Sequence, residues 1–99
     1  MGVTRYTELF SETDWTRFKE DLGLPPRQAE ILHCVLDGLS DKQIASALGI
    51  SFGTVRSHMT RLFGKFGSND RVELILCVFG HLRECHLRDE SASPSDLNS

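Results

Sequence analysis

The chain has 99 residues, which is enough for one small domain with a single hydrophobic core but too few for two domains of ordinary size. Its formal net charge is −3, and no apolar stretch is long enough to span a bilayer. The first ten residues also lack the apolar run and small-residue cleavage site of a secretory signal. We therefore expect a cytoplasmic protein with no membrane partner.

The charge is unevenly distributed along the chain. Residues 25–83 hold seven basic and five acidic side chains, whereas residues 1–24 hold three basic and five acidic ones and residues 84–99 hold one basic and four acidic ones. The acidic total therefore comes from the two ends, and it does not exclude binding of nucleic acid by the middle of the chain. A central charge of only +2 predicts a modest, salt-sensitive affinity per copy, which favours binding as a dimer.

The three cysteines, Cys34, Cys77 and Cys85, are an odd number at irregular spacing in apolar, helix-like segments. This pattern favours buried thiols in a reducing compartment over a disulfide framework. Cys77, His81 and Cys85 are four residues apart, so they would lie along one side of a helix, where they could hold a soft metal ion. Because the sequence fixes no fourth ligand, we expect no metal and no cofactor, with the metal site kept as an open alternative.

The first predicted helix covers residues 13–22, within an N-terminal helical extension at residues 1–24. Its large apolar residues are spaced three and four apart and share one face: Trp15, Phe18 and Leu22. Gly23 is placed to end the helix. The apolar residues before it are expected to form a further turn: Tyr6, Leu9 and Phe10. We expect these large groups to pack on the chain's own domain.

Two more helices are predicted between residues 25 and 49. The first begins at the Pro25-Pro26 pair, whose fixed φ suits a first helical turn, and it ends at Gly38. Ser40 then reads as the N-cap of a short helix, with Gln43 three residues later completing a capping box. Gly49 is expected to close this short helix.

The segment from Ser51 to Phe66 carries basic side chains and no carboxylate, in a chain that is acidic overall. Its cationic residues are Arg56, Arg61 and Lys65, with His58 between them. At about 100° per residue, its large apolar residues gather on one side of a helix, which we expect to face the core, and its cationic residues lie on the other side, which we expect to be exposed. The apolar set is Phe52, Val55, Met59, Leu62, Phe63 and Phe66. Ser51 is the expected N-cap, and the short connection from the preceding helix predicts a helix-turn-helix corner.

A fourth helix is predicted after a loop at residues 67–70, with Asp70 as its cap and Glu73 reciprocating the cap. This helix is apolar over most of its circumference, so we expect it to have a packing partner on both sides. The chain beyond Leu87 is polar, and residues 85–99 are expected to be a mostly disordered tail.

Four segments together resemble the LuxR/GerE-type helix-turn-helix. They run Leu-Pro-Pro-Arg-Gln-Ala-Glu-Ile-Leu at 24–32, Gly-Leu-Ser-Asp-Lys-Gln-Ile-Ala at 38–45, Ser-Phe-Gly-Thr-Val-Arg-Ser-His at 51–58 and Arg-Val-Glu-Leu at 71–74. The match covers about 60 residues and keeps the family's spacing between segments. The resemblance implies an all-α fold, with a four-helix DNA-binding domain at residues 25–84 preceded by the helical extension.

The resemblance also implies roles for individual residues of a homodimeric, sequence-specific transcriptional regulator that binds double-stranded DNA. The third helix of this domain would enter the major groove and read bases with Arg56, Ser57 and Thr60. Phosphate contacts would come from Lys42, Ser51, Thr54, Arg61 and Lys65. The fourth helix would pair two subunits through Val72, Ile75, Val78 and Phe79.

The chain departs from the family pattern at several of these positions. Pro25 stands where the family commonly has Thr, so the helix that begins there loses a side-chain cap. Phe52 and Gly53 replace the polar or charged pair that usually follows the Ser cap. Thr60 and Gly64 stand where basic residues are frequent, which weakens the expected electrostatic attraction to DNA.

Two other readings of the same fold remain open. A promoter-reading domain of the sigma factor region 4 type shares the Leu-Pro-Pro-Arg-Gln opening, but the apolar fourth helix argues against it. A protein interaction module with reduced DNA binding, acting on a regulatory protein partner, fits the two glycines and the missing basic residues. An enzyme is not expected, because the histidines lie in helix-like segments and none is combined with a nucleophile and an acid at triad-like positions.

Overall fold

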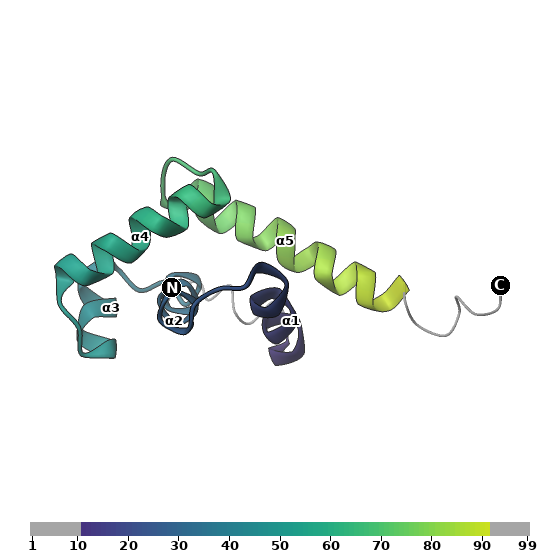
Figure 1. Cartoon of the computed structure of the whole chain (residues 1–99), viewed down its shortest axis with the longest axis horizontal. Helices are drawn as coiled ribbons and strands as arrows, with labels where there is room; N and C mark the ends of the chain where they lie inside the picture. The colour runs from purple at the N-terminus through teal and green to yellow at the C-terminus, as the bar shows by residue number, and fades with distance from the viewer. Residues whose placement is uncertain (1–10, 92–99) are drawn as a thin grey trace, which may run out of the picture.

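The computed structural model of the protein describes residues 11–91, apart from the side chains of residues 85, 86 and 88–91. This part of the chain folds into five helices and contains no strand. The helices are α1 (Glu12–Leu22), α2 (Pro26–Leu36), α3 (Asp41–Leu48), α4 (Phe52–Phe66) and α5 (Arg71–Ser91). In Figure 1, α4 and α5 meet at their shared loop and slope away from each other, with α3, α2 and α1 beneath them. The predicted all-α architecture, four helices plus an N-terminal helical extension, is confirmed.

The helix starts agree with the predicted caps. The Ser40 hydroxyl accepts a hydrogen bond from the Gln43 amide at 3.2 Å, and the Gln43 side chain accepts one from the Ser40 amide at 2.8 Å. Ser11 forms an equivalent capping box with Asp14 at the start of α1. Pro25 precedes α2 without any side-chain cap, as the departure from the family pattern predicted. Each cap satisfies amide groups that a helix cannot pair internally.

The start of α5 differs in one detail from the predicted cap. The Asp70 carboxylate accepts from the Glu73 amide at 2.9 Å, as expected. The Glu73 carboxylate, however, accepts from the amide of Asn69 at 2.8 Å and not from that of Asp70. The reciprocal bond is therefore made one residue earlier in the loop.

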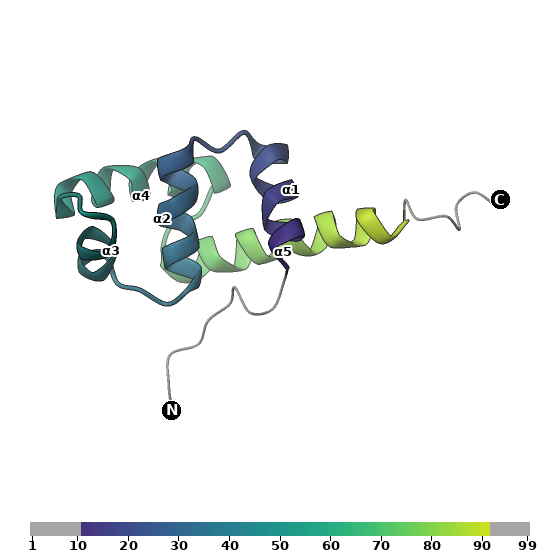
Figure 2. The same cartoon turned by 90° about the horizontal axis from the view of Figure 1, so that it is seen from below.

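One hydrophobic core holds all five helices together. Helix α2 lies between α3 and α1 in both views (Figures 1 and 2) and supplies the largest share of the buried side chains. The fully buried apolar residues come from every helix: Phe18, Ile31, Leu32, Val35, Leu36, Ile44, Val55, Leu62, Leu74 and Val78. Burying each such side chain contributes roughly 1.5–3 kcal/mol of transfer free energy, which fixes α4 against the rest of the domain.

Helix α1 is an integral part of this body. The Phe18 ring, completely buried, stacks on the Phe66 ring of α4 at a centroid distance of 6.2 Å, and His81 of α5 contacts both rings. Trp15 stacks on Phe18 at 5.3 Å. The expectation that α1 packs on its own domain is confirmed. The further turn expected around Tyr6, Leu9 and Phe10 lies outside the described residues.

Helix α5 continues to Ser91, into the range 85–99 in which a mostly disordered tail was expected. Its last turns project beyond the rest of the body in both views (Figures 1 and 2). Residues 81–93 contain neither Gly nor Pro, and adding a residue to a formed helix costs far less than starting one. The helix therefore extends past Leu82, the last buried residue among its described side chains. Residues 92–99 lie outside the described part.

Candidate nucleic-acid interface

Helices α3 and α4 form the tight corner that the sequence predicted. Gly49 ends α3 in the left-handed conformation, with φ of 67°, which a residue with a side chain adopts only at a cost. The Ile50 amide then donates to the Ala45 carbonyl at 3.1 Å, and Ser51 caps α4 immediately afterwards. Ile50 precedes the cap and packs against the core that contains Val55, which is the arrangement of a hydrophobic staple. The geometry is that of a helix-turn-helix with α4 as its second, outer helix.

Helix α4 has two chemically different sides. Val55, Met59 and Leu62 are buried in the core, and Phe63 and Phe66 pack against its edge. The opposite side is exposed and consists of small and basic residues, without a carboxylate: Gly53, Arg56, Ser57, Thr60, Arg61, Gly64 and Lys65. Fifteen residues at 1.5 Å per residue give a helix of roughly 22 Å, longer than the width of the DNA major groove of about 12 Å.

Phe52 does not lie in the core, contrary to the prediction from helical periodicity. Its side chain is 45% exposed, since it is the first residue of α4 and precedes Val55, the first residue of that helix to be buried in the core. The guanidinium carbon of Arg56 lies 5.8 Å from the centre of its ring, within the range of a cation–π contact. The exposed Phe52 ring thus contacts the guanidinium group of Arg56.

The three residues predicted to read bases are all exposed on the outer side of α4. Arg56 and Thr60 are one helical turn apart, and the Thr60 hydroxyl donates to the Arg56 carbonyl at 3.1 Å. Such a bond leaves the lone pairs of the Thr60 oxygen available to an outside donor. Ser57 is exposed between them in sequence. The positions of these residues are compatible with base reading, and their role stays a prediction.

The residues predicted to bind phosphate are also exposed, on two helices. Lys42 lies in the first turn of α3, and Arg61 and Lys65 lie in the second half of α4. The Ser51 hydroxyl accepts from the Thr54 amide at 3.0 Å and is 2.8 Å from the Thr54 hydroxyl, so these two residues together form the cap of α4. The start of a helix presents amide groups and a positive dipole end, both of which favour a phosphate.

One electrostatic network at this surface was not predicted. Asp41, the first residue of α3, contacts Arg56 through one carboxylate oxygen at 3.4 Å and Arg71 through the other at 2.9 Å. Arg71 also donates to the Leu39 carbonyl, so it connects α5 to the loop before α3. Asp41 is separated by 15 residues from Arg56 and by 30 from Arg71, and no local sequence pattern reports contacts at such separations.

The predicted dimer surface on α5 needs one correction. Val78 is completely buried in the core of its own protomer, so its side chain offers no surface to a second subunit. Ile75 packs partly against the same core, and Phe79 is partly exposed. Val72 is exposed by 65%, so it remains a candidate. The error arose because a helix that is apolar on nearly all sides gives no periodic signal for which side faces the core.

Two exposed apolar residues of α5 were missed by the sequence analysis. Leu76 is 64% exposed and Leu87 is 48% exposed, although both are large and apolar. With Val72, they lie on the side of α5 opposite the buried Leu74 and Val78 at 100° per residue. The spacing of four between Val72 and Leu76 was the signal that could have identified them.

The cysteines form no evident reactive or metal-binding centre within the described side chains, where no three candidate ligands come together. Cys77 is partly buried on α5, His81 contacts the rings of Phe18 and Phe66, and the side chain of Cys85 lies outside the described part. Burial raises the pKa of the Cys34 thiol above its ordinary value, and the nearby carboxylates of Asp37 and Glu30 raise it further. Cys34 is therefore held as a thiol and not as the nucleophilic thiolate.

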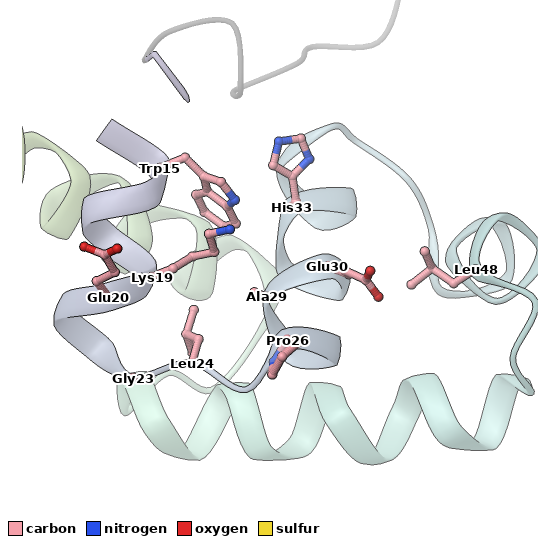
Figure 3. A pocket seen from close by; sticks show the side chains of 10 residues that line it. All are labelled: Trp15, Lys19, Glu20, Gly23, Leu24, Pro26, Ala29, Glu30, His33 and Leu48. Carbon is pink, nitrogen blue, oxygen red and sulfur yellow. The ribbon is translucent and has the colours of Figure 1, made fainter. Parts of the chain in front are cut away.

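A groove between α1 and α2 lies away from the outer side of α4. Figure 3 shows Trp15 and Lys19 on the α1 side and His33 on the α2 side, with Leu24 on the loop between the two helices, while Glu30 points away from α1 toward Leu48. Its volume is about 690 Å³, and it is open to solvent. The Trp15 and His33 rings meet edge to face at a centroid distance of 5.2 Å, which connects the two walls.

No helix within the described residues is long and apolar enough to cross a membrane.

A helix-turn-helix corner with an exposed basic side on its second helix is typical of DNA-binding domains. Residues 23–78 match the model of the bacterial regulatory proteins of the luxR family, which is more than half of the chain. The protein belongs to the luxR family.

Several proteins with similar sequences are named as regulators. The chain is 39% identical over 59 residues to a protein of Aeromonas salmonicida named as an HTH-type transcriptional regulator, covering 60% of this chain and 30% of that protein. It is 38% identical over 60 residues to the response regulator Rre1 of Synechocystis, covering 61% and 26%, respectively. It is 37% identical over 65 residues to the transcriptional regulatory protein TdiR of Thauera aromatica, covering 63% and 29%. The chain thus spans less than a third of the length of these relatives, and no solved structure matches it.

Proposed function

We propose that the protein is a sequence-specific transcriptional regulator that binds double-stranded DNA as a homodimer in the cytoplasm, and that it has no enzymatic activity of its own. In this proposal α4 lies in the major groove, Arg56 reads a guanine, and Ser57 and Thr60 contact neighbouring bases. The observation that carries it is the exposed, carboxylate-free side of α4, placed outward by a helix-turn-helix corner in a chain of the luxR family.

The chemistry of α4 supports base reading by one strong residue. A guanidinium offers parallel N–H donors that match the O6 and N7 acceptors of guanine, and such a pair contributes about 1–3 kcal/mol of discrimination. Ser57 and Thr60 have short hydroxyl side chains, which hydrogen-bond to several bases and discriminate less. Phosphate contacts from Lys42, Arg61, Lys65 and the capped start of α4 would then fix the register of the helix without reading sequence.

The exposed apolar residues on the outer side of α5 support the homodimer. Val72, Leu76 and Leu87 expose large apolar groups on one side of α5, which is costly in water unless another apolar surface covers them. A second copy would offer the same surface in a self-complementary, two-fold arrangement. Pairing through α5 would also place two α4 helices on one DNA molecule, which compensates for the small positive charge of each copy.

Binding of duplex DNA across a salt series tests the proposal. With roughly five phosphates neutralised per dimer, the slope of log affinity against log salt should be steeper than about −4. The measurement uses fluorescence anisotropy of a labelled random-sequence duplex, followed by a duplex selected from a random pool. A flat salt response would contradict DNA binding and favour the protein interaction module instead.

A further inference from the structure

The carboxylate of Asp41 occupies a special place beside the predicted base-reading residue. It is only 17% exposed, and it lies between the guanidinium groups of Arg71 and Arg56. Its contact with Arg71 is the shorter one, at 2.9 Å, and Arg71 is itself fixed by the Leu39 carbonyl. Asp41 is therefore held in place from the core side, and its second oxygen faces Arg56 on the solvent side.

Arg56 is the more exposed partner in this arrangement. Its side chain is 64% exposed, and it has two weak contacts, the 3.4 Å contact with Asp41 and the Phe52 ring at 5.8 Å. An exposed ion pair of this kind adds little to folding stability. The fixed acceptor and the aromatic face nevertheless restrict the rotamers of the Arg56 side chain before DNA binds. Without them, the side chain would lose this conformational freedom during binding, at a cost to the binding free energy.

We propose that Asp41 is a positioning and specificity-determining residue for DNA binding, acting through Arg56. The inference rests on the proposed function and adds a residue to it. The Asp41 contact uses Nη1 of Arg56, which leaves Nε and Nη2 as a pair of adjacent donors for the O6 and N7 acceptors of guanine. Arg56 can thus keep its contact with Asp41 while it reads a base.

The negative charge of Asp41 also affects the discrimination between specific and non-specific DNA. A carboxylate at the edge of the interface repels the phosphate backbone of every DNA sequence, so it lowers non-specific affinity. It also competes with phosphates for the Arg56 guanidinium, and only an acceptor pair with the geometry of guanine compensates for that competition. Asp41 therefore raises the ratio of specific to non-specific binding by both routes.

The test compares Asp41→Asn with the wild-type protein on a duplex selected from a random pool and on a random-sequence duplex of equal length. We expect Asp41→Asn to bind random DNA more tightly than the wild-type protein does. The ratio of its affinity for the selected duplex to its affinity for the random duplex should fall about threefold or more, a fraction of the discrimination that one bidentate guanine pair provides. Asp41→Glu, which retains the charge and the acceptor, should restore the ratio to within about twofold. Thermal melting checks the fold, and Asp41→Ser replaces Asp41→Asn if the latter unfolds.

A matched control and a double-mutant cycle separate positioning from simple charge. Glu12 is the exposed first residue of α1, as Asp41 is the first residue of α3, so Glu12→Gln removes the same charge from the same helical position away from α4. It should leave the ratio unchanged. In an Arg56→Ala background, Asp41→Asn should no longer change the ratio.

Two results would overturn the inference while leaving DNA binding intact. One is an equal change in the ratio for Asp41→Asn with and without Arg56, which would make the effect independent of the guanidinium. The other is an Asp41→Asn protein that behaves like Glu12→Gln on both duplexes. If instead the wild-type protein shows no salt-dependent binding to either duplex, the proposed function itself fails, and the inference fails with it.

Discussion

Helices α4 and α5 bury similar apolar sides in the same core, but their outer sides differ in kind. The outer side of α4 is hydrated, with small residues between basic ones, and residues 51–66 contain no carboxylate. The outer side of α5 exposes Val72, Leu76 and Leu87. A surface of the first kind is stable in water and attracts anions, whereas one of the second kind is stabilised by removal from water. The comparison indicates two different partners, a polyanion for α4 and an apolar surface for α5.

The largest expected effects distinguish the two sides of α5. Val78→Asp should unfold the protein, because it places an unpaired charge in the core at a cost above about 4 kcal/mol. Leu76→Asp should leave the protomer folded, because that side chain is exposed, but it should yield monomers. Loss of bivalent binding should then lower DNA affinity by about a hundredfold. Circular dichroism and sedimentation velocity measure fold and mass, respectively.

A dimeric Leu76→Asp variant would remove α5 as the interface. The groove between α1 and α2, with Trp15 partly exposed on its wall, would then be the next surface to test, for example by Trp15→Ala. Thr16→Ala, an exposed α1 residue outside that groove, is the matched control.

The next largest effect is expected for Arg56→Ala on the outer side of α4. Loss of a bidentate contact with guanine should cost about 1–3 kcal/mol on a selected duplex and should relax the preference at one base pair. Competition binding against a panel of single-base variants of the duplex measures that preference. Equal losses on selected and random DNA would show that Arg56 binds only phosphate.

The sequence predicted local features of this fold well, because each depends on neighbouring residues. Ser40 and Gln43 were recognisable as a capping box, and the Gly49 turn and Ser51 cap defined the corner. Each interaction is made within a few residues along the chain. The same reasoning placed the cationic side chains of α4 on its exposed side.

Features that depend on the tertiary arrangement could not be predicted in the same way. Periodicity assigned Phe52 to the core, but the first residue of α4 that the core buries is Val55. It also gave no means of choosing the buried side of α5, which led to Val78 in the predicted interface. The bridge from Arg56 through Asp41 to Arg71 joins residues of three helices. Only packing determines such contacts.

A smaller and sequence-independent effect is expected for Lys65→Ala. Lys65 is exposed near the end of α4, about 13 Å along the helix axis from Arg56 at 1.5 Å per residue, and we expect it to bind phosphate. Its removal should weaken binding to selected and random duplexes by the same factor. It should also reduce the salt slope by about 0.9 for each phosphate that is no longer neutralised. A change confined to the selected duplex would instead make Lys65 a base reader.

The smallest effects concern a glycine on the outer side of each helix. A Cβ placed on Gly64 of α4 or on Gly80 of α5 would meet no other atom within 4 Å, so neither glycine is needed for packing within the protomer. Replacing either by Ala should therefore raise the free energy of unfolding, by about 1 kcal/mol for Gly80 in the helix interior and by less for Gly64 in the last turn. Urea denaturation measures both changes.

The two variants should differ in the binding equilibrium that each one weakens. If the backbone of α4 approaches DNA closely, Gly64→Ala should weaken DNA binding despite its greater stability and leave the dimer unchanged. If two α5 helices cross near Gly80, Gly80→Ala should instead weaken the dimer, since the added methyl groups would separate the helices. Variants that are stabilised and change neither equilibrium would show that neither glycine lies at an interface, and the outer sides would then differ only in their larger side chains.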